Sequence, residues 1–590
     1  VWMVTTSNTA STINGSSVTA ELANRNVLIE ASAGNVVVDT DVPYNGSANR
    51  TLTLRATVNV VHEATARVRS TSGPLNVIYW SDSDWLNGGG ISVSGTGANF
   101  RIETRGGHVA LGGRAAQDAL WNGLRIPSGH AAGFGAQTSM WWGVHLHAES
   151  LISTSGGNVR IWGKSYASPG VSALYGISMN QGVINAGSGS LELNGLTSGA
   201  PSLTNGMNYG VRIQSANIVA PSIRATGGIS ITGEADLQQE HRGVFASGGT
   251  FDSGSSTTSL TSVRRTALGA GNLWKSPTTL SASTDIAITG SQSAESSFAA
   301  TCATGAFTNP SGAIDAAGDL AINCRDITTS AALTAGGNLT LDNHSTSSTT
   351  AVTVNANLVS DVAGGSILLK SKSDIILGTS VSVQTAGRLS GAGGNIVLWS
   401  DSDASGQGNV DISPNSVLNS IGGATGTFTG GGDIHIAGGL DNGSNDISTA
   451  AQSSDGLPDG WAISTSDVKI GINYGVSAVA GNVNTINSGG GNIRMFGKNT
   501  TGADAIAFNW TTRMEAGQGQ IEIQGHSAGW GLQLNRGGAA DTYSTNTVIT
   551  SRSAQSPTIY MKGVSTTSGT EVALLGSFGD AGTDNLVIQA

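Results

Sequence analysis

The amino-acid sequence predicts an all-β fold: a parallel β-helix with three sheets per turn that stacks into an elongated rod. Of the 590 residues, 85 are glycine, and serine, threonine and asparagine are abundant, which is too many turn formers for long helices. Yet 38% of the residues are hydrophobic, more than a disordered Gly/Ser chain would contain. A chain of this length exceeds one compact core, so it forms either several domains or a repeat structure.

A repeat is visible in the sequence. Glycines that open similar segments recur at Gly143, Gly176, Gly210 and Gly243, a period of 33 or 34 residues. Each period holds three short runs of alternating apolar residues, such as GVHLHA, LIST and NVRIWG, separated by turn residues. Three short strands cannot bury their inner face alone, but stacked copies bury a continuous core. Successive copies run in the same direction, so equivalent strands pair in parallel, and the stretch 164–174 is expected to be an outward loop.

Two other architectures have similar repeat lengths or composition. A helical solenoid needs long segments with 3.6-residue periodicity, which the frequent glycines and β-branched residues exclude. An antiparallel sandwich predicts frequent Asn-Gly hairpin turns and no fixed long period. Such turns are sparse in this chain, so the parallel β-helix is the better prediction.

The chain is also duplicated on a larger scale. The stretch WSDSD occurs at 80–84 and again at 399–403, and 474–502 matches the segment that begins at Trp142. We therefore predict a first β-helix copy over 1–255, connecting β-helix turns over 256–330, and a second copy over 331–590. Roughly 20 turns at about 4.8 Å each predict a rod on the order of 100 Å long.

Charge and hydropathy exclude some partners. Only 11% of residues are charged and the net charge is −11, so the basic patches that neutralise nucleic-acid phosphates are lacking. No apolar run reaches the roughly 18 to 20 residues that span a bilayer, and no secretory signal opens the chain. The chain begins at Val1 without an initiator Met, so we expect a mature or excised piece of a longer polypeptide.

The two cysteines, Cys302 and Cys324, lie in one stretch. If the local winding brings them onto adjacent turns, the spacing of stacked strands suits a disulfide. The alternative is a pair of buried free thiols.

The WSDSD segments invite a metal or a catalytic interpretation. Asp82 and Asp84, like Asp401 and Asp403, follow one strand and precede another, so we expect them to hydrogen-bond a turning backbone. As a calcium loop the first copy is one residue out of step with EF-hand spacing.

His145 and His147 lie two residues apart on one strand face, near Trp141 and Trp142, and a zinc site would need a third and a fourth ligand at the right distance. We expect a solvated or stacked pair, and no metal or cofactor.

Aromatic residues precede the opening glycines. Trp142, Tyr175 and Tyr209 recur once per turn and should stack into a ladder, with Tyr474 and Trp530 at similar places in the second copy. A ladder that faces inward is packing, whereas an outward ladder is a platform for sugar rings. Both alternatives stay open at this point.

The segments GGNIVLWSDSD and GGGISVSG and the recurring aromatic-Gly-hydrophobic strands resemble the repeat region of filamentous haemagglutinin-like exoproteins, along nearly the whole chain. The resemblance implies a right-handed β-helix fibre on the bacterial surface or outside the cell, exported through an outer-membrane transporter by two-partner secretion. The Asn-Pro-Asn motifs of that family's secretion domain do not occur in the chain.

We therefore expect a non-catalytic extracellular fibre segment of an adhesin, presenting loops to a host-cell or surface glycan or receptor. The main alternative is a structural protein that self-associates into filaments or a coat through uncapped end turns. A third is a polysaccharide-degrading enzyme, since β-helices host such enzymes, but the NTD, DD, GHG and RIK motifs of the polygalacturonase type are missing.

Overall fold

The computed structural model describes residues 1–6, 11–86, 88–94, 101–133, 141–166, 174–198, 208–215, 220–235, 241–345, 351–385, 392–421, 430–441, 455–467, 469–475, 482–509, 511–536, 548–553, 558–567, 572–573, 577–578 and 586–589. The chain divides into two compact units, unit 1 (Val1–Ser296) and unit 2 (Ser297–Ala590). The boundary falls within the stretch 256–330 that we assigned to connecting turns.

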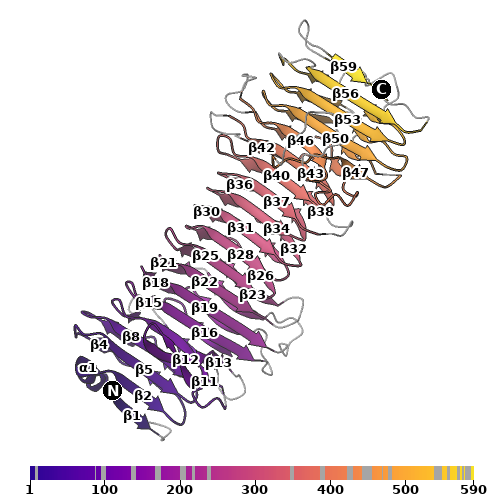
Figure 1. Ribbon diagram of the computed structural model, residues 1–590. Coiled ribbons are helices and arrows are strands. Elements are labelled where there is room, and N and C mark those ends of the chain that lie inside the picture. Colours follow the sequence, from indigo (N-terminus) through magenta and orange to yellow (C-terminus); the bar gives the residue numbers. More distant parts are fainter. Residues whose placement is uncertain are drawn as a thin grey trace. The chain divides into compact units, whose positions relative to one another are not determined.

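Each unit is a right-handed parallel β-helix with three sheets, here named A, B and C, so the predicted fold class is confirmed (Figure 1). In unit 1, sheet A contains β1 (Trp2–Thr6), β2 (Val27–Ala31), β5 (Arg50–Ala56), β8 (Leu75–Ser81), β11 (Val109–Trp121), β12 (Leu124–Gly129), β13 (Ala131–Gly133), β16 (Val159–Tyr166), β19 (Leu191–Ser198), β22 (Ile229–Glu234), β25 (Thr258–Ser262) and β28 (Thr278–Ala282). Sheet B contains β3 (Val36–Val38), β6 (Val60–His62), β9 (Ile91–Val93), β14 (Trp142–Leu146), β17 (Tyr175–Asn180), β20 (Tyr209–Gln214), β23 (Arg242–Ser247), β26 (Arg265–Leu268) and β29 (Ile286–Ile288). Sheet C contains β4 (Val42–Tyr44), β7 (Arg67–Ser70), β10 (Arg101–Glu103), β15 (Leu151–Ser153), β18 (Val183–Gly187), β21 (Ser222–Ala225), β24 (Thr250–Asp252), β27 (Asn272–Trp274) and β30 (Gln292–Ala294).

Unit 2 repeats this order of sheets. Its sheet A contains β31 (Phe298–Cys302), β34 (Leu320–Cys324), β37 (Leu339–Asn343), β40 (Ile367–Ser371), β43 (Ile396–Ser400), β46 (Ile434–Gly438), β47 (Ala462–Ser464), β50 (Ile493–Asn499), β53 (Ile521–Ser527), β56 (Ile559–Ser565) and β59 (Leu586–Gln589). Sheet B contains β32 (Ala306–Asn309), β35 (Asp326–Thr329), β38 (Ala351–Val354), β41 (Asp374–Leu377), β44 (Val410–Ile412), β48 (Ile472–Tyr474), β51 (Ile506–Asn509), β54 (Leu532–Arg536) and β57 (Val572–Ala573). Sheet C contains β33 (Ile314–Ala316), β36 (Leu333–Ala335), β39 (Leu358–Ser360), β42 (Ser382–Thr385), β45 (Val417–Asn419), β49 (Val483–Asn487), β52 (Thr511–Glu515), β55 (Val548–Thr550) and β58 (Ser577–Phe578).

Like side chains stack on like in the interior. Ile161, Leu193, Ile231, Leu260 and Leu280 are register partners from one turn to the next, and none is more than 1% exposed. Burying each such side chain stabilises the fold by about 1.5–3 kcal/mol. The alternating apolar pattern of the sequence is therefore the inner face of each strand.

The repeated motif Gly-Gly-Asn before a strand supports a ladder of hydrogen bonds along the stack. The Asn158 Oδ1 atom accepts from the Ser190 backbone N at 3.0 Å, and Asn492 Oδ1 accepts from Gln520 N at 2.9 Å. Asp433 occupies the equivalent position in the turn before Asn492, and its Oδ1 accepts from the Asn492 backbone N at 2.7 Å. Each amide or carboxylate oxygen thus satisfies a backbone N–H of the next turn at a corner where no strand partner is available.

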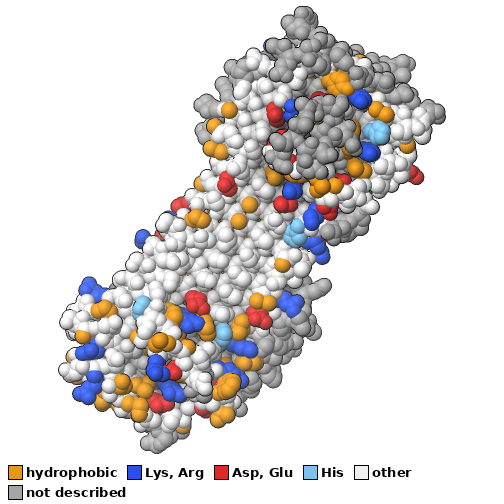
Figure 2. Space-filling model, viewed as in Figure 1, with side chains coloured by type: hydrophobic (Ala, Val, Ile, Leu, Met, Phe, Trp, Pro, Cys, Tyr) orange, Lys and Arg blue, Asp and Glu red, His pale blue; other side chains and the backbone are white. Residues whose placement is uncertain are grey.

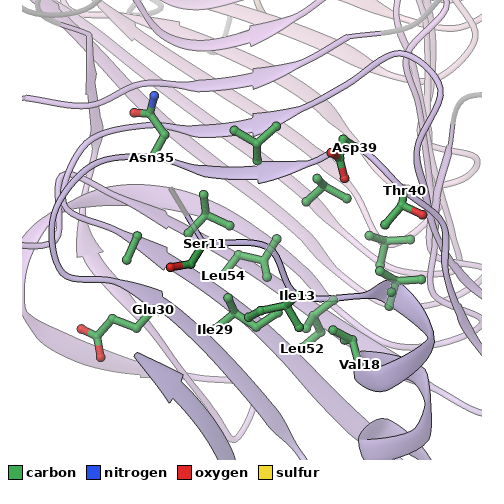
Figure 3. Close-up of a pocket in the computed structure, with 17 residues that line it drawn as sticks. Ser11, Ile13, Val18, Ile29, Glu30, Asn35, Asp39, Thr40, Leu52 and Leu54 are labelled. Carbon is green, nitrogen blue, oxygen red and sulfur yellow. The ribbon is translucent and has the colours of Figure 1, made fainter. Parts of the chain in front are cut away.

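The first turn of unit 1 has a helix where the later turns have strands of sheets B and C. Helix α1 (Gly15–Asn24) starts at Asn14, whose side chain accepts from Ser16 N at 3.0 Å, and it buries Val18 and Leu22. Figure 3 shows Val18 beside Leu52 at a cavity of about 110 Å³, which apolar side chains line together with polar residues such as Asn35 and Asp39. Helix α1 thus covers apolar side chains of the first turns of unit 1, while β1 pairs along one edge with β2. The expectation of uncapped end turns stays a prediction.

A hairpin breaks the parallel pattern in unit 1. Strand β11 runs on past the corner and pairs antiparallel with β12, the only antiparallel strand pair among the described strands. Ile126 of the hairpin buries against Ile78 and Ala110 on the outer face of sheet A, with Trp121 and Leu124 packed beside them. Figure 2 shows apolar and charged side chains gathered in this part of unit 1.

Cys302 and Cys324 form a disulfide between β31 and β34 in unit 2, with the two Cα atoms 4.5 Å apart and both residues fully buried. They occupy corresponding places in two successive turns, which is the arrangement that the strand spacing favours.

The asparagine ladder can be tested with Asn158. We expect Asn158→Ala to lower the free energy of unfolding by about 1 kcal/mol, because the Ser190 N–H loses its acceptor. Asn158→Asp keeps an acceptor oxygen, as Asp433 does in unit 2, and should cost less. Thermal unfolding followed by circular dichroism measures both, and equal losses in the two variants would contradict the ladder.

The disulfide closes a loop between cysteines 22 positions apart. We expect Cys302→Ala/Cys324→Ala to destabilise unit 2 by about 3 kcal/mol in the chain-entropy model. A thiol assay on protein that was purified without reductant and then denatured should detect no free thiol. Two reactive thiols per chain would show instead that the cysteines are a buried unbonded pair.

Candidate functional site

The candidate site is a row of aromatic rings on the outer face of sheet B in unit 1. Trp142, Tyr175 and Tyr209 are register partners at the starts of β14, β17 and β20, and Arg242 takes the same place in β23. The rings of Tyr175 and Tyr209 have centroids 5.6 Å apart. All three aromatic side chains are half-buried.

The glycine that follows each ring sets the position of this row. The start of each sheet B strand crosses the sheet A strand before it, so closely that a Cβ added at Gly210, which follows Tyr209, would lie 2.5 Å from the carbonyl oxygen of Gly195. Only glycine fits at such a crossing. Residues 167–173, 199–207 and 236–240, which connect sheet A strands to the next sheet B strands, lie outside the described residues. The predicted outward loop at 164–174 therefore lies partly outside them.

The rings face outward. Val144 and Leu146 point into the core, while His145 between them lies outside, and its ring centroid is 4.2 Å from that of Trp142. Similarly, the Tyr209 ring lies 5.5 Å from Phe245, whose chain neighbours Val244 and Ala246 are buried inside. Of the two alternatives for Trp142, Tyr175 and Tyr209, the outward arrangement is the one observed.

Two arginines cover the row. The Arg212 guanidinium lies 4.9 Å from the Tyr175 ring, and that of Arg242 lies 5.9 Å from the Tyr209 ring and 5.4 Å from the Phe245 ring. Burial raises the pKa of Tyr209, so its hydroxyl stays protonated at neutral pH. The surface therefore combines flat ring faces with positive charge, in a protein whose net charge is negative.

The two histidines extend the same surface. The rings of His145 and His147 have centroids 3.7 Å apart, and His147 Nε2 lies 3.0 Å from the Ser92 hydroxyl. Burial lowers the pKa of His145 to about 3, helped by the neighbouring His147 and Arg212, so its ring is neutral at physiological pH. Among the described residues no group of three or more His, Cys, Asp or Glu side chains is arranged to hold a metal ion.

Tyr474 and Trp530 do not form an equivalent row in unit 2. Tyr474 is fully buried at the end of β48, with its hydroxyl donating to the Thr485 carbonyl at 3.2 Å, and burial raises its pKa. Trp530 is half-buried and lies just before β54. Strand β51 lies between β54 and the strand of Tyr474, β48, so the two residues are not on neighbouring turns. The sequence match was misleading because Gly475, with φ of 82°, ends its strand, whereas Gly143 lies within one.

The two WSDSD segments are matching corners. Ser81 and Ser400 donate to the carbonyls of Gly89 and Gly408 at 2.7 and 2.8 Å, which closes each corner. The first aspartate of each has a left-handed backbone, with φ of 48° at Asp82 and 47° at Asp401. Their carboxylates accept from the turn itself.

In the first corner Asp82 Oδ1 accepts from Gly88 N at 3.1 Å. In the second, Asp401 accepts from the Ser405 hydroxyl at 3.0 Å and from Gly406 N at 3.1 Å. Burial raises the pKa of Asp82 to about 6, while Arg114, 3.9 Å away, opposes this. The repeated aspartates thus hold a backbone corner, as the turn pattern predicts.

Comparisons with known proteins do not add to this geometry. The chain matches no model of a known protein family, and no curated protein matches it. Within the described residues, no helix is both long and apolar enough to cross a membrane. The chain is a parallel β-helical repeat protein, and its resemblance to filamentous haemagglutinin-like exoproteins stays a prediction.

Proposed function

We propose that this chain is a non-catalytic segment of an extracellular bacterial adhesin fibre, similar to the filamentous haemagglutinin-like exoproteins, that binds glycans on cells or surfaces. The observation that carries the proposal is the outward row of Trp142, Tyr175 and Tyr209 with its two arginines. Surface location and export through an outer-membrane transporter belong to the proposal and rest on the sequence resemblance.

The row has the chemistry that sugar recognition needs. Half-buried rings are held in place by their neighbours, so they lose little conformational entropy when a flat ligand packs on them. The apolar face of a pyranose ring packs on an aromatic ring, and the Arg212 and Arg242 guanidinium groups donate to hydroxyl or acidic substituents. Because the rings repeat from one turn to the next, the surface suits an extended oligosaccharide.

The proposal of a non-catalytic role rests on how the aspartates of the two WSDSD corners are used. Acid–base cleavage of a polysaccharide needs carboxylates that face the substrate. The carboxylates of Asp82 and Asp401 instead accept hydrogen bonds within their own corners. A stacked β-helix also tolerates long loops at its corners, which suits a fibre that presents binding surfaces.

The row can be tested with a glycan array and with binding to whole cells. We expect Tyr175→Ala/Tyr209→Ala to weaken binding at least tenfold, since two stacking contacts worth about 1 kcal/mol each are lost. Arg212→Gln should weaken binding without removing a ring. The control Trp85→Ala removes an aromatic that is 60% exposed in the first WSDSD corner and does not belong to the row.

Circular dichroism and thermal unfolding must show that each variant keeps its β-structure. Binding that survives both changes in the row, or that Trp85→Ala weakens equally, would contradict the proposal. Wild-type protein that binds no glycan and assembles into continuous polymers would favour self-association as the function instead.

A further inference from the structure

Unit 2 contains a hollow on the outer face of sheet A that is separate from the ring row of unit 1. The cavity has a volume of about 360 Å³, within the range of pockets for small ligands, and is lined by Trp461, Lys498, Gln524, Gly525, His526, Lys562 and Val564. These residues come from β50, β53 and β56 and from the residue just before β47.

The short strand β47 positions the tryptophan. It pairs in parallel with the second half of β50, so that Ile463 is the register partner of Lys498. The Trp461 ring then packs edge-to-face on Phe496, with centroids 6.3 Å apart, and lies 6.3 Å from the His526 ring. Trp461 is thus held from one side by the apolar cluster of Phe496 and Ala437 and is only half-buried.

Strand register places the polar groups around this ring. Lys498 pairs with His526 on β53, and Gln524 pairs with Lys562 on β56. Within the described part of the chain, neither lysine lies within ion-pair distance of an acidic group. The nearby Glu522 is engaged by Gln524, at 2.6 Å, and by Arg494, at 3.8 Å. The hollow therefore presents, beside an aromatic ring, two ammonium groups that have no acidic partner among the described residues.

Unit 1 contains the same backbone arrangement with different chemistry. Strand β13 pairs with the second half of β16, with Ala132 beside Lys164, and the preceding His130 stacks on Trp162 at a centroid distance of 5.1 Å. By register, the counterparts of His526, Lys562 and Val564 are Leu196, Thr232 and Glu234. Unit 2 therefore has one more lysine at this place and lacks the acid, and it has a tryptophan where unit 1 has His130 and a histidine where unit 1 has Leu196.

We propose that the hollow of unit 2 binds a carboxylated pyranose, with the sugar ring on Trp461 and the carboxylate between Lys498 and Lys562. An ammonium group forms a charge-assisted hydrogen bond to a carboxylate, and Gln524 and His526 offer polar groups to the hydroxyls. The site is independent of the proposed role of the ring row, because it lies in the other unit and shares no residue with it.

Isothermal titration of the full chain tests the proposal, with methyl β-D-glucuronide and a sialic acid glycoside as the two sources of a carboxylated ring. The control ligand is methyl β-D-glucoside, which has the same ring as the glucuronide without the carboxylate. At least one acid should bind ten times more tightly than the glucoside, and added salt should weaken that binding. Whichever of the two acids binds more tightly identifies the kind of carboxylated sugar that the hollow recognises.

Matched variants locate the site. Lys498→Gln/Lys562→Gln and Trp461→Ala should each weaken binding at least tenfold, whereas Lys164→Gln, at the counterpart position in unit 1, should leave it unchanged. Tyr175→Ala/Tyr209→Ala should also leave it unchanged, which separates this site from the ring row. No binding of either acid, equal binding of the glucoside, or an equal loss in Lys164→Gln would overturn the proposal, provided that each variant unfolds at the wild-type temperature.

Discussion

Parallel, in-register stacking of successive turns is the constraint on which the rest of each unit depends. The N–H and C=O groups of a strand find their partners in the turns before and after it, so no strand can shift alone without leaving buried polar groups unpaired. Register places Ile161 beside Leu193 in the core. It also places Tyr175 beside Tyr209 on the surface. A surface row of rings is thus a direct consequence of repeating one residue type at one place in each turn.

Much of this could be predicted from the sequence because the signals are local and recur. Alternation identifies the inner face of a strand, and the 33- or 34-residue period of the glycines corresponds to one turn that includes a long corner extension. The corners at Asp82 and Asp401 were predictable for the same reason, since their hydrogen bonds connect residues within the same turn of chain. The proximity of Cys302 and Cys324 followed from the winding.

Other features depend on register that the sequence pattern does not specify. Turns differ in length: Leu320 and Leu339, for example, are register partners although only 19 residues separate them in the sequence. The sequence comparison therefore placed Tyr474 at the start of a strand, whereas Tyr474 is the last residue of β48. The β11–β12 hairpin and helix α1 interrupt the period, and no repeat predicts an interruption. The hollow at Trp461 combines side chains from separate turns, and only the pairings of β47, β50, β53 and β56 bring them together.

The two surfaces use the same scaffold in different ways: the ring row lies where sheet B strands start, and the hollow lies beside a short strand added to sheet A. Both require that neighbouring turns stay in register, which cross-linking measures directly. Thr261 and Ser281 are exposed register partners on β25 and β28. Parallel in-register stacking predicts that Thr261→Cys/Ser281→Cys forms a disulfide under mild oxidation, whereas Thr261→Cys/Thr279→Cys, two residues out of register, does not. Efficient cross-linking of the second pair in place of the first would contradict the parallel in-register stack.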